Sequence, residues 1–145
     1  MALQITRNDI LARDLHDVVT KPDDCVVVSG TLEDAYTGAT IEFRRGPNSD
    51  EVQIDHVVAL SNAWQTGAQT LTPDQRRDLA NDPDNLQAVR GSANQQKGDA
   101  GAASWLPRTE YRCTYTARQV QVKTRYGLWV TPAEHDALAR ILNAC

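Results

Sequence analysis

An aspartate and a histidine stand together in an otherwise apolar segment, Ile54-Asp55-His56-Val57-Val58. Burying a carboxylate and an imidazole in a plain core strand costs free energy, because both groups lose their hydration. The cost is offset if Asp55 holds a metal cation, and at a strand end His56 could then address a neighbouring water. An isolated Asp-His pair is more often structural than catalytic, so its interpretation depends on the surrounding pattern.

Two further polar segments complete a pattern with this pair. Asn85 opens the short apolar run Asn85 to Val89, and the polar stretch after it contains Asn94-x-x-Lys97-Gly98-Asp99. The order is strand, connection, short strand and short polar helix, with the acid and histidine on the first element and Asn-x-x-Lys on the last. This pattern resembles the HNH endonuclease motif, also called ββα-metal. Together with the phrase from Ile54 to Trp64, it looks like the small bacterial nucleases of the DUF1524 type.

The resemblance implies a phosphodiester hydrolase that cuts DNA, and RNA as an alternative, with little sequence specificity. It implies that His56 is the general base that activates water, and that Asp55 and Asn94 hold one divalent cation. Asn85 would tie the connecting loop to the catalytic strand, and Lys97 would face a phosphate or the leaving group. These five residues are the candidate catalytic residues of the chain.

The types of these side chains suit that chemistry. The ordinary pKa of histidine, about 6.5, allows it to take a proton from water near neutral pH. One carboxylate and one amide oxygen form a hard ligand set, which favours Mg²⁺ or Mn²⁺ over Zn²⁺. Many HNH enzymes have histidine at the position of Asn94, so we expect this chain to bind softer divalent ions less well.

The first third of the chain predicts a helix and a hairpin. Apolar residues from Thr6 to Val19 are spaced for one face of an amphipathic helix, with Thr6 or Asn8 as its cap. The β-branched run from Cys25 to Gly30 and the alternating residues from Thr40 to Arg44 predict two strands. Tyr36-Thr37-Gly38 would form the turn between them.

The remaining sequence predicts short elements and then longer helices. Thr72-Pro73 and Thr131-Pro132-Ala133-Glu134 are typical of helix starts, because a capping threonine precedes proline at the first helical position. The expected elements are, in order, a strand over 52–58, a short helix from 60 to 64, a helix over 74–81, a strand over 85–89, a polar helix over 92–97 capped by Ser92, a helix over 109–126 and a last helix after Thr131.

These elements predict a mixed α+β fold in one domain over residues 1–145. The ββα-metal core would span about residues 52–99, with the N-terminal helix and hairpin and the C-terminal helices added to it. No internal repeat, linker or apolar run long enough for a membrane span interrupts the sequence. We therefore expect no membrane association.

The net charge of −4 argues against tight binding of nucleic acid by overall charge alone. A basic stretch from Arg108 to Arg125 nevertheless carries five cations and one acid, Glu110. It has two interpretations of equal weight: a phosphate-facing strip, or a helix face that is merely solvated.

Three cysteines allow at most one intramolecular disulfide. A bridge between Cys113 and Cys145 would tie the last helix to its predecessor and leave Cys25 as a buried strand residue; three reduced cysteines in a cytoplasmic protein are the alternative. Secreted relatives in the resembled family often have a cysteine before Thr-Arg-Asn-Asp, where this chain has Gln4 and Ile5. We expect a secreted protein slightly more than a cytoplasmic one.

Three hypotheses on function follow. The first is an HNH endonuclease that acts on nucleic acid as a monomer. The second is a non-catalytic nucleic-acid-binding domain that uses the stretch from Arg108 to Arg125. The third is a toxin-like nuclease effector with an immunity or inhibitor protein as its partner. Trp64, Trp105 and Trp129 could stack on bases, but tryptophans in a small domain more often serve packing, and we assign them to it.

Overall fold

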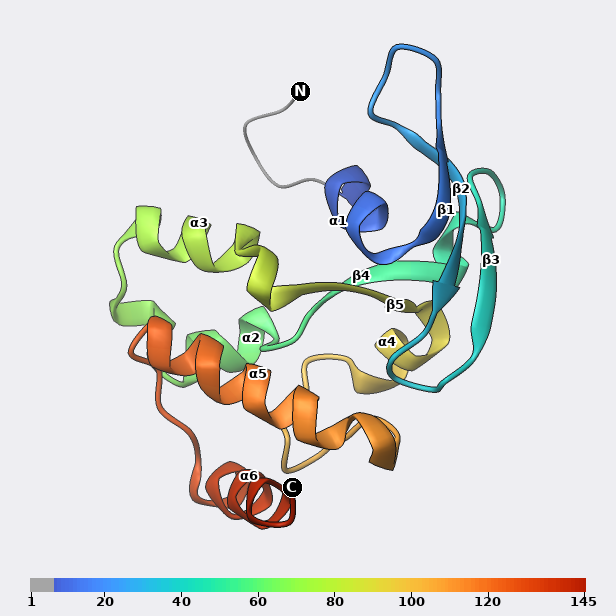
Figure 1. Cartoon of the computed structure of the whole chain (residues 1–145). Helices are drawn as coiled ribbons and strands as arrows, with labels where there is room; N and C mark the ends of the chain where they lie inside the picture. Colours follow the sequence, from blue (N-terminus) through green and yellow to red (C-terminus); the bar gives the residue numbers. More distant parts are fainter. Residues whose placement is uncertain (1–6) are drawn as a thin grey trace.

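Two small antiparallel sheets and a set of helices make up the computed structural model, which describes residues 7–145 (Figure 1). The first sheet has the strand order β1-β2-β3, and the second pairs β4 with β5. Their bounds are β1 (His16–Thr20), β2 (Val27–Glu33), β3 (Thr40–Arg44), β4 (Val52–His56) and β5 (Leu86–Arg90). The predicted mixed α+β class is confirmed.

The N-terminal helix is shorter than the sequence predicted. Helix α1 (Arg7–Asp14) ends before His16–Thr20, which forms β1, so the prediction of a helix to Val19 is wrong in its second half. The β-branched residues in β1 favour a strand, and pairing with β2 gives their backbone groups hydrogen-bond partners. Asn8 lies inside α1 and its side chain accepts a hydrogen bond from a backbone N–H of β2. The alternative cap, Thr6, lies outside the described residues.

The predicted hairpin is confirmed, and its turn is fastened to the second sheet. Strands β2 and β3 pair in antiparallel register, with Gly30 opposite Phe43. The Asp34 carboxylate accepts hydrogen bonds from the Thr37 backbone N–H at 2.9 Å and from the backbone N–H of Arg90, at the end of β5, also at 2.9 Å. This link places the turn residues beside the β4–β5 pair.

Helix α4 (Gly91–Lys97) follows β5 directly and packs against both strands of the second sheet. Gly91 is required at its start, because a Cβ atom there would collide with the carbonyl oxygen of Asp50. Arg90 occupies the N-cap position and Ser92 is exposed within the helix, so the prediction of a Ser92 cap is wrong. The close approach of two backbones, rather than a side-chain cap, fixes where this helix begins.

The other predicted helices are present with small changes of bounds. Capping boxes formed by Thr72 with Gln75 and by Thr131 with Glu134 begin α3 and α6 as the sequence indicated. The helices are α2 (Leu60–Gln65), α3 (Pro73–Asn81), α5 (Arg112–Arg125) and α6 (Pro132–Asn143). Single 3₁₀ turns lie at Ser49–Glu51, Ala68–Thr70, Pro83–Asn85 and Thr109–Tyr111.

Buried side chains gather in three clusters around the second sheet. One lies between α1, the first sheet and the β4–β5 pair, and includes Leu11, Val27 and Val52. A second surrounds Tyr36 and Tyr115, and a third lies among α2, α3 and α5. In Figure 1 the β4–β5 pair accordingly lies between the three-stranded sheet and the helices α2, α3 and α5.

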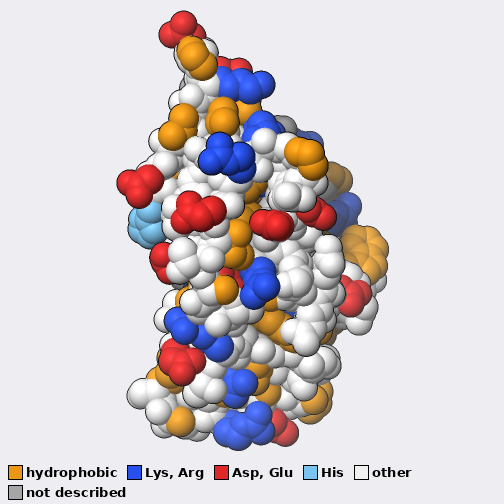
Figure 2. Space-filling view, turned by 90° about the vertical axis from the view of Figure 1, so that its right-hand side faces the viewer, with side chains coloured by type: hydrophobic (Ala, Val, Ile, Leu, Met, Phe, Trp, Pro, Cys, Tyr) orange, Lys and Arg blue, Asp and Glu red, His pale blue; other side chains and the backbone are white. Residues whose placement is uncertain are grey.

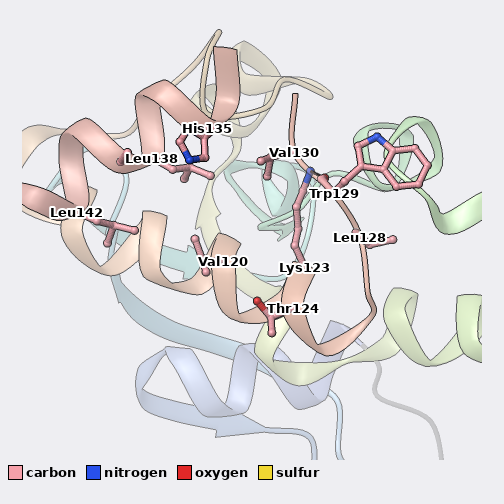
Figure 3. A pocket seen from close by; sticks show the side chains of 10 residues that line it. Val120, Lys123, Thr124, Leu128, Trp129, Val130, His135, Leu138 and Leu142 are labelled. Atoms are coloured by element: carbon pink, nitrogen blue, oxygen red, sulfur yellow. Dashed lines mark hydrogen bonds between the residues drawn. The ribbon is translucent and has the colours of Figure 1, made fainter. Parts of the chain in front are cut away.

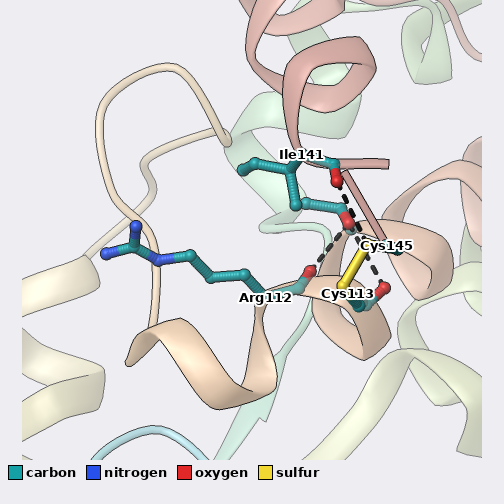
Figure 4. Close-up of a disulfide and its surroundings, with 5 residues drawn as sticks. Arg112, Cys113, Ile141 and Cys145 are labelled. Atoms are coloured by element: carbon teal, nitrogen blue, oxygen red, sulfur yellow. Dashed lines mark hydrogen bonds between the residues drawn. A yellow bond between two sulfur atoms is a disulfide. The ribbon is translucent and has the colours of Figure 1, made fainter. Parts of the chain in front are cut away.

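The predicted disulfide is confirmed. Cys113 in α5 is bonded to Cys145 beyond α6, with their Cα atoms 5.9 Å apart (Figure 4). Cys25 is free and half-buried just before β2, so the prediction of a buried strand residue is wrong for it. Among residues 7–145, none of the helices combines the length and the apolar character that crossing a membrane requires.

Candidate active site

Strand β4 presents two polar side chains toward α4. Side chains alternate along a strand, so Gln53 and Asp55 share one face while His56 points to the other. Asp55 is buried, and its Oδ2 accepts hydrogen bonds from the Tyr36 hydroxyl at 2.5 Å and the Lys97 ammonium at 2.7 Å. Its other oxygen, Oδ1, has no hydrogen-bond donor among the described residues.

Helix α4 contributes Asn94 and Lys97, which lie about one turn apart and therefore face the same strand. The Asn94 amide nitrogen donates to Gln53 Oε1 at 2.9 Å. This bond uses the nitrogen and leaves the Asn94 carbonyl oxygen free to bind something else. The structure thus brings Asp55, Asn94 and Lys97 to one side of β4.

Lys97 is the most enclosed of these residues, with none of its side chain exposed. Its ammonium also donates to the His56 carbonyl oxygen at 2.7 Å. Burial lowers the pKa of Lys97, and the negative charge of Asp55 opposes that change. The sequence led us to expect a lysine facing a phosphate or leaving group. The ammonium is instead held under α4, where it fixes Asp55.

Tyr36 is a site residue that the sequence did not identify. Its ring makes edge contacts with Trp105 at 5.0 Å and with Tyr115 at 5.7 Å between centroids. Burial and the charge of Asp55 raise the pKa of Tyr36 well above its ordinary value, so its hydroxyl remains a hydrogen-bond donor. No feature of the turn sequence indicates this contact of Tyr36 with Asp55. Gln53 is a second site residue that the sequence did not identify, although a polar residue two positions before Asp55 on a strand lies on the same face as Asp55.

His56 is oriented by α3 rather than by α4. Its Nε2 atom lies 2.9 Å from the carbonyl oxygen of Ala80, near the end of that helix. Because a carbonyl can only accept, Nε2 must carry a hydrogen in this contact, which leaves Nδ1 as the acceptor of the neutral ring. The partly exposed ring is therefore arranged to accept a proton at Nδ1, on the opposite strand face from Asp55.

Asn85 is fully buried and fastens the chain immediately after β4. Its Oδ1 accepts from the Val58 N–H at 2.7 Å, and its Nδ2 donates to the Val58 carbonyl at 3.2 Å. The backbone carbonyl of Asn85 also accepts from the Val57 N–H at 2.9 Å. These bonds hold the start of β5 against the segment that leaves His56, so Asn85 fixes the direction in which the chain leaves the site.

Most cations of the basic stretch from Arg108 to Arg125 form contacts within the protein. Neither the phosphate-facing interpretation nor the solvated-face interpretation predicted this. Arg118 donates to Gln87 and to the Asp84 carbonyl oxygen, both at 2.7 Å, and Arg125 pairs with Asp82 at 2.7 Å. These bonds tie α5 to β5 and to the turn before it. On the face of the molecule that carries the three-stranded sheet, Figure 2 shows cationic and acidic side chains interspersed rather than a basic patch.

Residues 5–141 match the family of GmrSD restriction endonucleases, C-terminal domain. The chain belongs to this family. It is also 43% identical over 143 residues to an uncharacterized secreted protein of Arthroderma benhamiae, an alignment that covers 97% of this chain and 67% of that relative. All the candidate residues of this GmrSD C-terminal domain fall within the matched range, and membership relates the chain to the restriction-endonuclease group of nucleases.

Proposed function

We propose that this GmrSD-type domain is a metal-dependent endonuclease of the HNH class that hydrolyses phosphodiester bonds in nucleic acid. The observation that carries the proposal is the asymmetry of the Asp55 carboxylate. Lys97 and Tyr36 bind one oxygen, while the other oxygen has no donor within residues 7–145, on the side of β4 where Asn94 also lies. The succession of β4, β5 and α4 supports a ββα-metal core.

The donor atoms of this site fit a hard divalent cation. Asp55 Oδ1 and the Asn94 carbonyl oxygen are both oxygen donors, and both remain without a hydrogen-bond donor in the described chain. Mg²⁺ and Mn²⁺ accept such a sparse set because water and substrate phosphate complete their shell. When bound, the cation would act as a Lewis acid on a phosphate oxygen.

His56 is the general base in this proposal. A water beside Nδ1 gives up its proton to the ring, while the Ala80 carbonyl keeps the opposite nitrogen protonated and the ring in place. Lys97 and Tyr36 are positioning residues, because each acts by holding Asp55 rather than by touching substrate. The alternative of a non-catalytic domain that binds through Arg108 to Arg125 loses support, since several of those cations are paired internally.

We also propose that the protein is secreted. The Arthroderma benhamiae relative is named a secreted protein, and the Cys113–Cys145 disulfide is of a kind that persists in oxidising compartments.

A plasmid-cleavage assay with Mg²⁺ or Mn²⁺ tests the nuclease proposal. His56→Ala should lower the cleavage rate by at least about 100-fold, because general-base catalysis typically contributes that much. His135→Ala is the matched control: this histidine is exposed on α6, with its ring 3.5 Å from a carboxylate oxygen of its neighbour Asp136, so cleavage should be unchanged. Equal rates in the parent and His56→Ala, or no cleavage with either metal, would contradict the proposal.

A further inference from the structure

Helix α3 links the candidate base His56 to a second pair of side chains, Trp64 and Arg76. The Ala80 carbonyl of α3 holds the His56 ring, and one turn earlier on the same helix face Arg76 lies over the Trp64 ring, 5.4 Å from its centroid. Four helical residues rise about 6 Å along the axis. The Arg76 backbone is therefore about one helical turn from the carbonyl that orients His56, while its guanidinium reaches back toward the start of α3.

Trp64 is not used as an ordinary packing residue. Half of its surface, 50%, is exposed, and Leu60, one turn earlier on α2, is 42% exposed. Trp105 packs against Tyr36 as predicted, so the assignment of tryptophans to packing holds for it but describes Trp64 poorly. Trp64 lies on α2, which begins shortly after β4 ends at His56, and its indole offers exposed apolar surface that a ligand could cover.

The cation above this ring is fixed in advance. The Arg76 guanidinium donates to the Leu71 carbonyl at 3.1 Å and, more weakly, to the Gln69 carbonyl at 3.4 Å. It therefore keeps its place over the Trp64 ring without a ligand. A flat aromatic surface with a fixed positive charge matches a nucleotide, which offers a flat base and an anionic phosphate.

Resting on the proposed nuclease function, we propose that the exposed part of the Trp64 ring is a stacking platform for an unstacked base of the substrate, while Arg76 over the ring supplies a positive charge. In an intact duplex both faces of a base are already covered by its neighbours, so such a platform selects single-stranded nucleic acid or bases displaced from a helix. The site would then prefer single strands, loops and frayed ends. Trp64 is a specificity-determining residue in this view and takes no part in proton transfer.

Binding of a labelled oligo-dT strand by the His56→Ala chain tests this inference without cleavage. Fluorescence anisotropy should show that Trp64→Ala weakens binding by about tenfold, as loss of base–aromatic stacking does. Trp64→Phe should keep most of the affinity because it retains an aromatic face, whereas Trp64→Leu should behave like alanine. Binding of a duplex should be weaker from the start and insensitive to all three changes.

Trp129→Ala is the matched control, because Trp129 is also half exposed, at 54%. Its ring packs on Gly67 at the rim of an apolar groove of about 510 Å³ between α5 and α6 (Figure 3), and the strand should bind this variant as well as the parent. The inference is overturned if the parent does not bind the strand, if Trp64→Ala binds it unchanged, or if Trp129→Ala loses as much.

Cleavage by the chain with and without His56 is measured separately, so the two proposals can fail independently. Cleavage that requires His56 while Trp64→Ala leaves strand binding intact would remove the stacking inference alone. Absence of cleavage together with Trp64-dependent strand binding would remove the nuclease proposal and leave a binding platform.

Discussion

Two buried lysines each pair with a carboxylate in this molecule, one in the candidate site and one in the helical scaffold. Lys97 contacts Asp55 at 2.7 Å between β4 and α4, and Lys123 contacts Glu134 at 3.4 Å between α5 and α6. Burial lowers the pKa of both lysines, and in both the partner carboxylate opposes the change. By residue type and environment the two pairs look alike.

The two pairs differ in how many oxygens of the carboxylate have a hydrogen-bond donor. Both oxygens of Glu134 are engaged, one by the Thr131 backbone N–H at 3.1 Å and the other by Asn62 and Lys123. Asp55 uses one oxygen for Lys97 and Tyr36 and keeps the other uncommitted within the described chain. A structural ion pair satisfies all its acceptors, whereas a pair that serves a ligand leaves one in reserve. This contrast separates the site from the scaffold.

Neutralising Asp55 or Glu134 in turn should show the largest difference between the candidate site and the scaffold. Asp55→Asn should lower the cleavage rate by about 1000-fold, because metal-ion stabilisation of the reaction is worth several kcal/mol. Glu134→Gln should leave the rate of the folded protein unchanged, although it weakens a pair of the same kind. Rates are compared at temperatures where circular dichroism shows both variants folded. A similar loss in Glu134→Gln would contradict the distinction.

Removing each lysine should affect stability unequally. Lys97→Met leaves Asp55 buried with the Tyr36 hydroxyl as its one donor in the described part of the chain, and should lower the free energy of unfolding by about 3 kcal/mol or more. Lys123→Met should cost less, about 1–2 kcal/mol, because Glu134 keeps its bonds from Thr131 and Asn62. Denaturant unfolding at neutral pH measures both. The reverse order would show that the Asp55 carboxylate is better supported than its contacts indicate.

Two tyrosines donate hydrogen bonds to carboxylates, Tyr36 to Asp55 in the candidate site and Tyr126 to Asp82 in the scaffold, the latter at 2.7 Å. Removing their hydroxyls should give the smallest effects and compare the two regions once more. Tyr36→Phe and Tyr126→Phe should each cost about 1 kcal/mol at neutral pH through the lost hydrogen bond. Only Tyr36→Phe should also slow cleavage. Equal effects of the two changes on cleavage would argue against a positioning role for Tyr36.

The same two variants have a defined pH dependence. Burial is the main cause that raises the pKa of Tyr36 and Tyr126 in the folded protein, whereas in the unfolded chain it is about 10. A raised folded pKa gives stability that is complete below about pH 10 and is lost as the pH rises beyond it. Unfolding free energies measured across that range should therefore fall less steeply in each phenylalanine variant than in the parent.

Local sequence determined most of the elements and the identity of the candidate residues. Capping threonines with proline at the first helical position begin α3 and α6 where the sequence indicated, because those interactions span only a few residues. The predicted order of strand, short strand and polar helix around Asp55, Asn85 and Asn94-x-x-Lys97 likewise agrees with β4, β5 and α4. The disulfide also agreed with the expected pairing.

Tertiary structure alone decided what each residue contacts. The segment from His16 to Thr20 has helical spacing, yet it is a strand because β2 offers it a hydrogen-bonding edge. Tyr36 reaches Asp55 across 19 positions of sequence and Lys97 reaches it across 42, distances at which no local pattern carries information. The cations of α5 likewise contact residues that are distant in sequence, and only the packing of the fold brings them together. Spacing along the chain selects the residue types of a site, but long-range packing assigns each atom its partner, and with it the oxygen left free on Asp55.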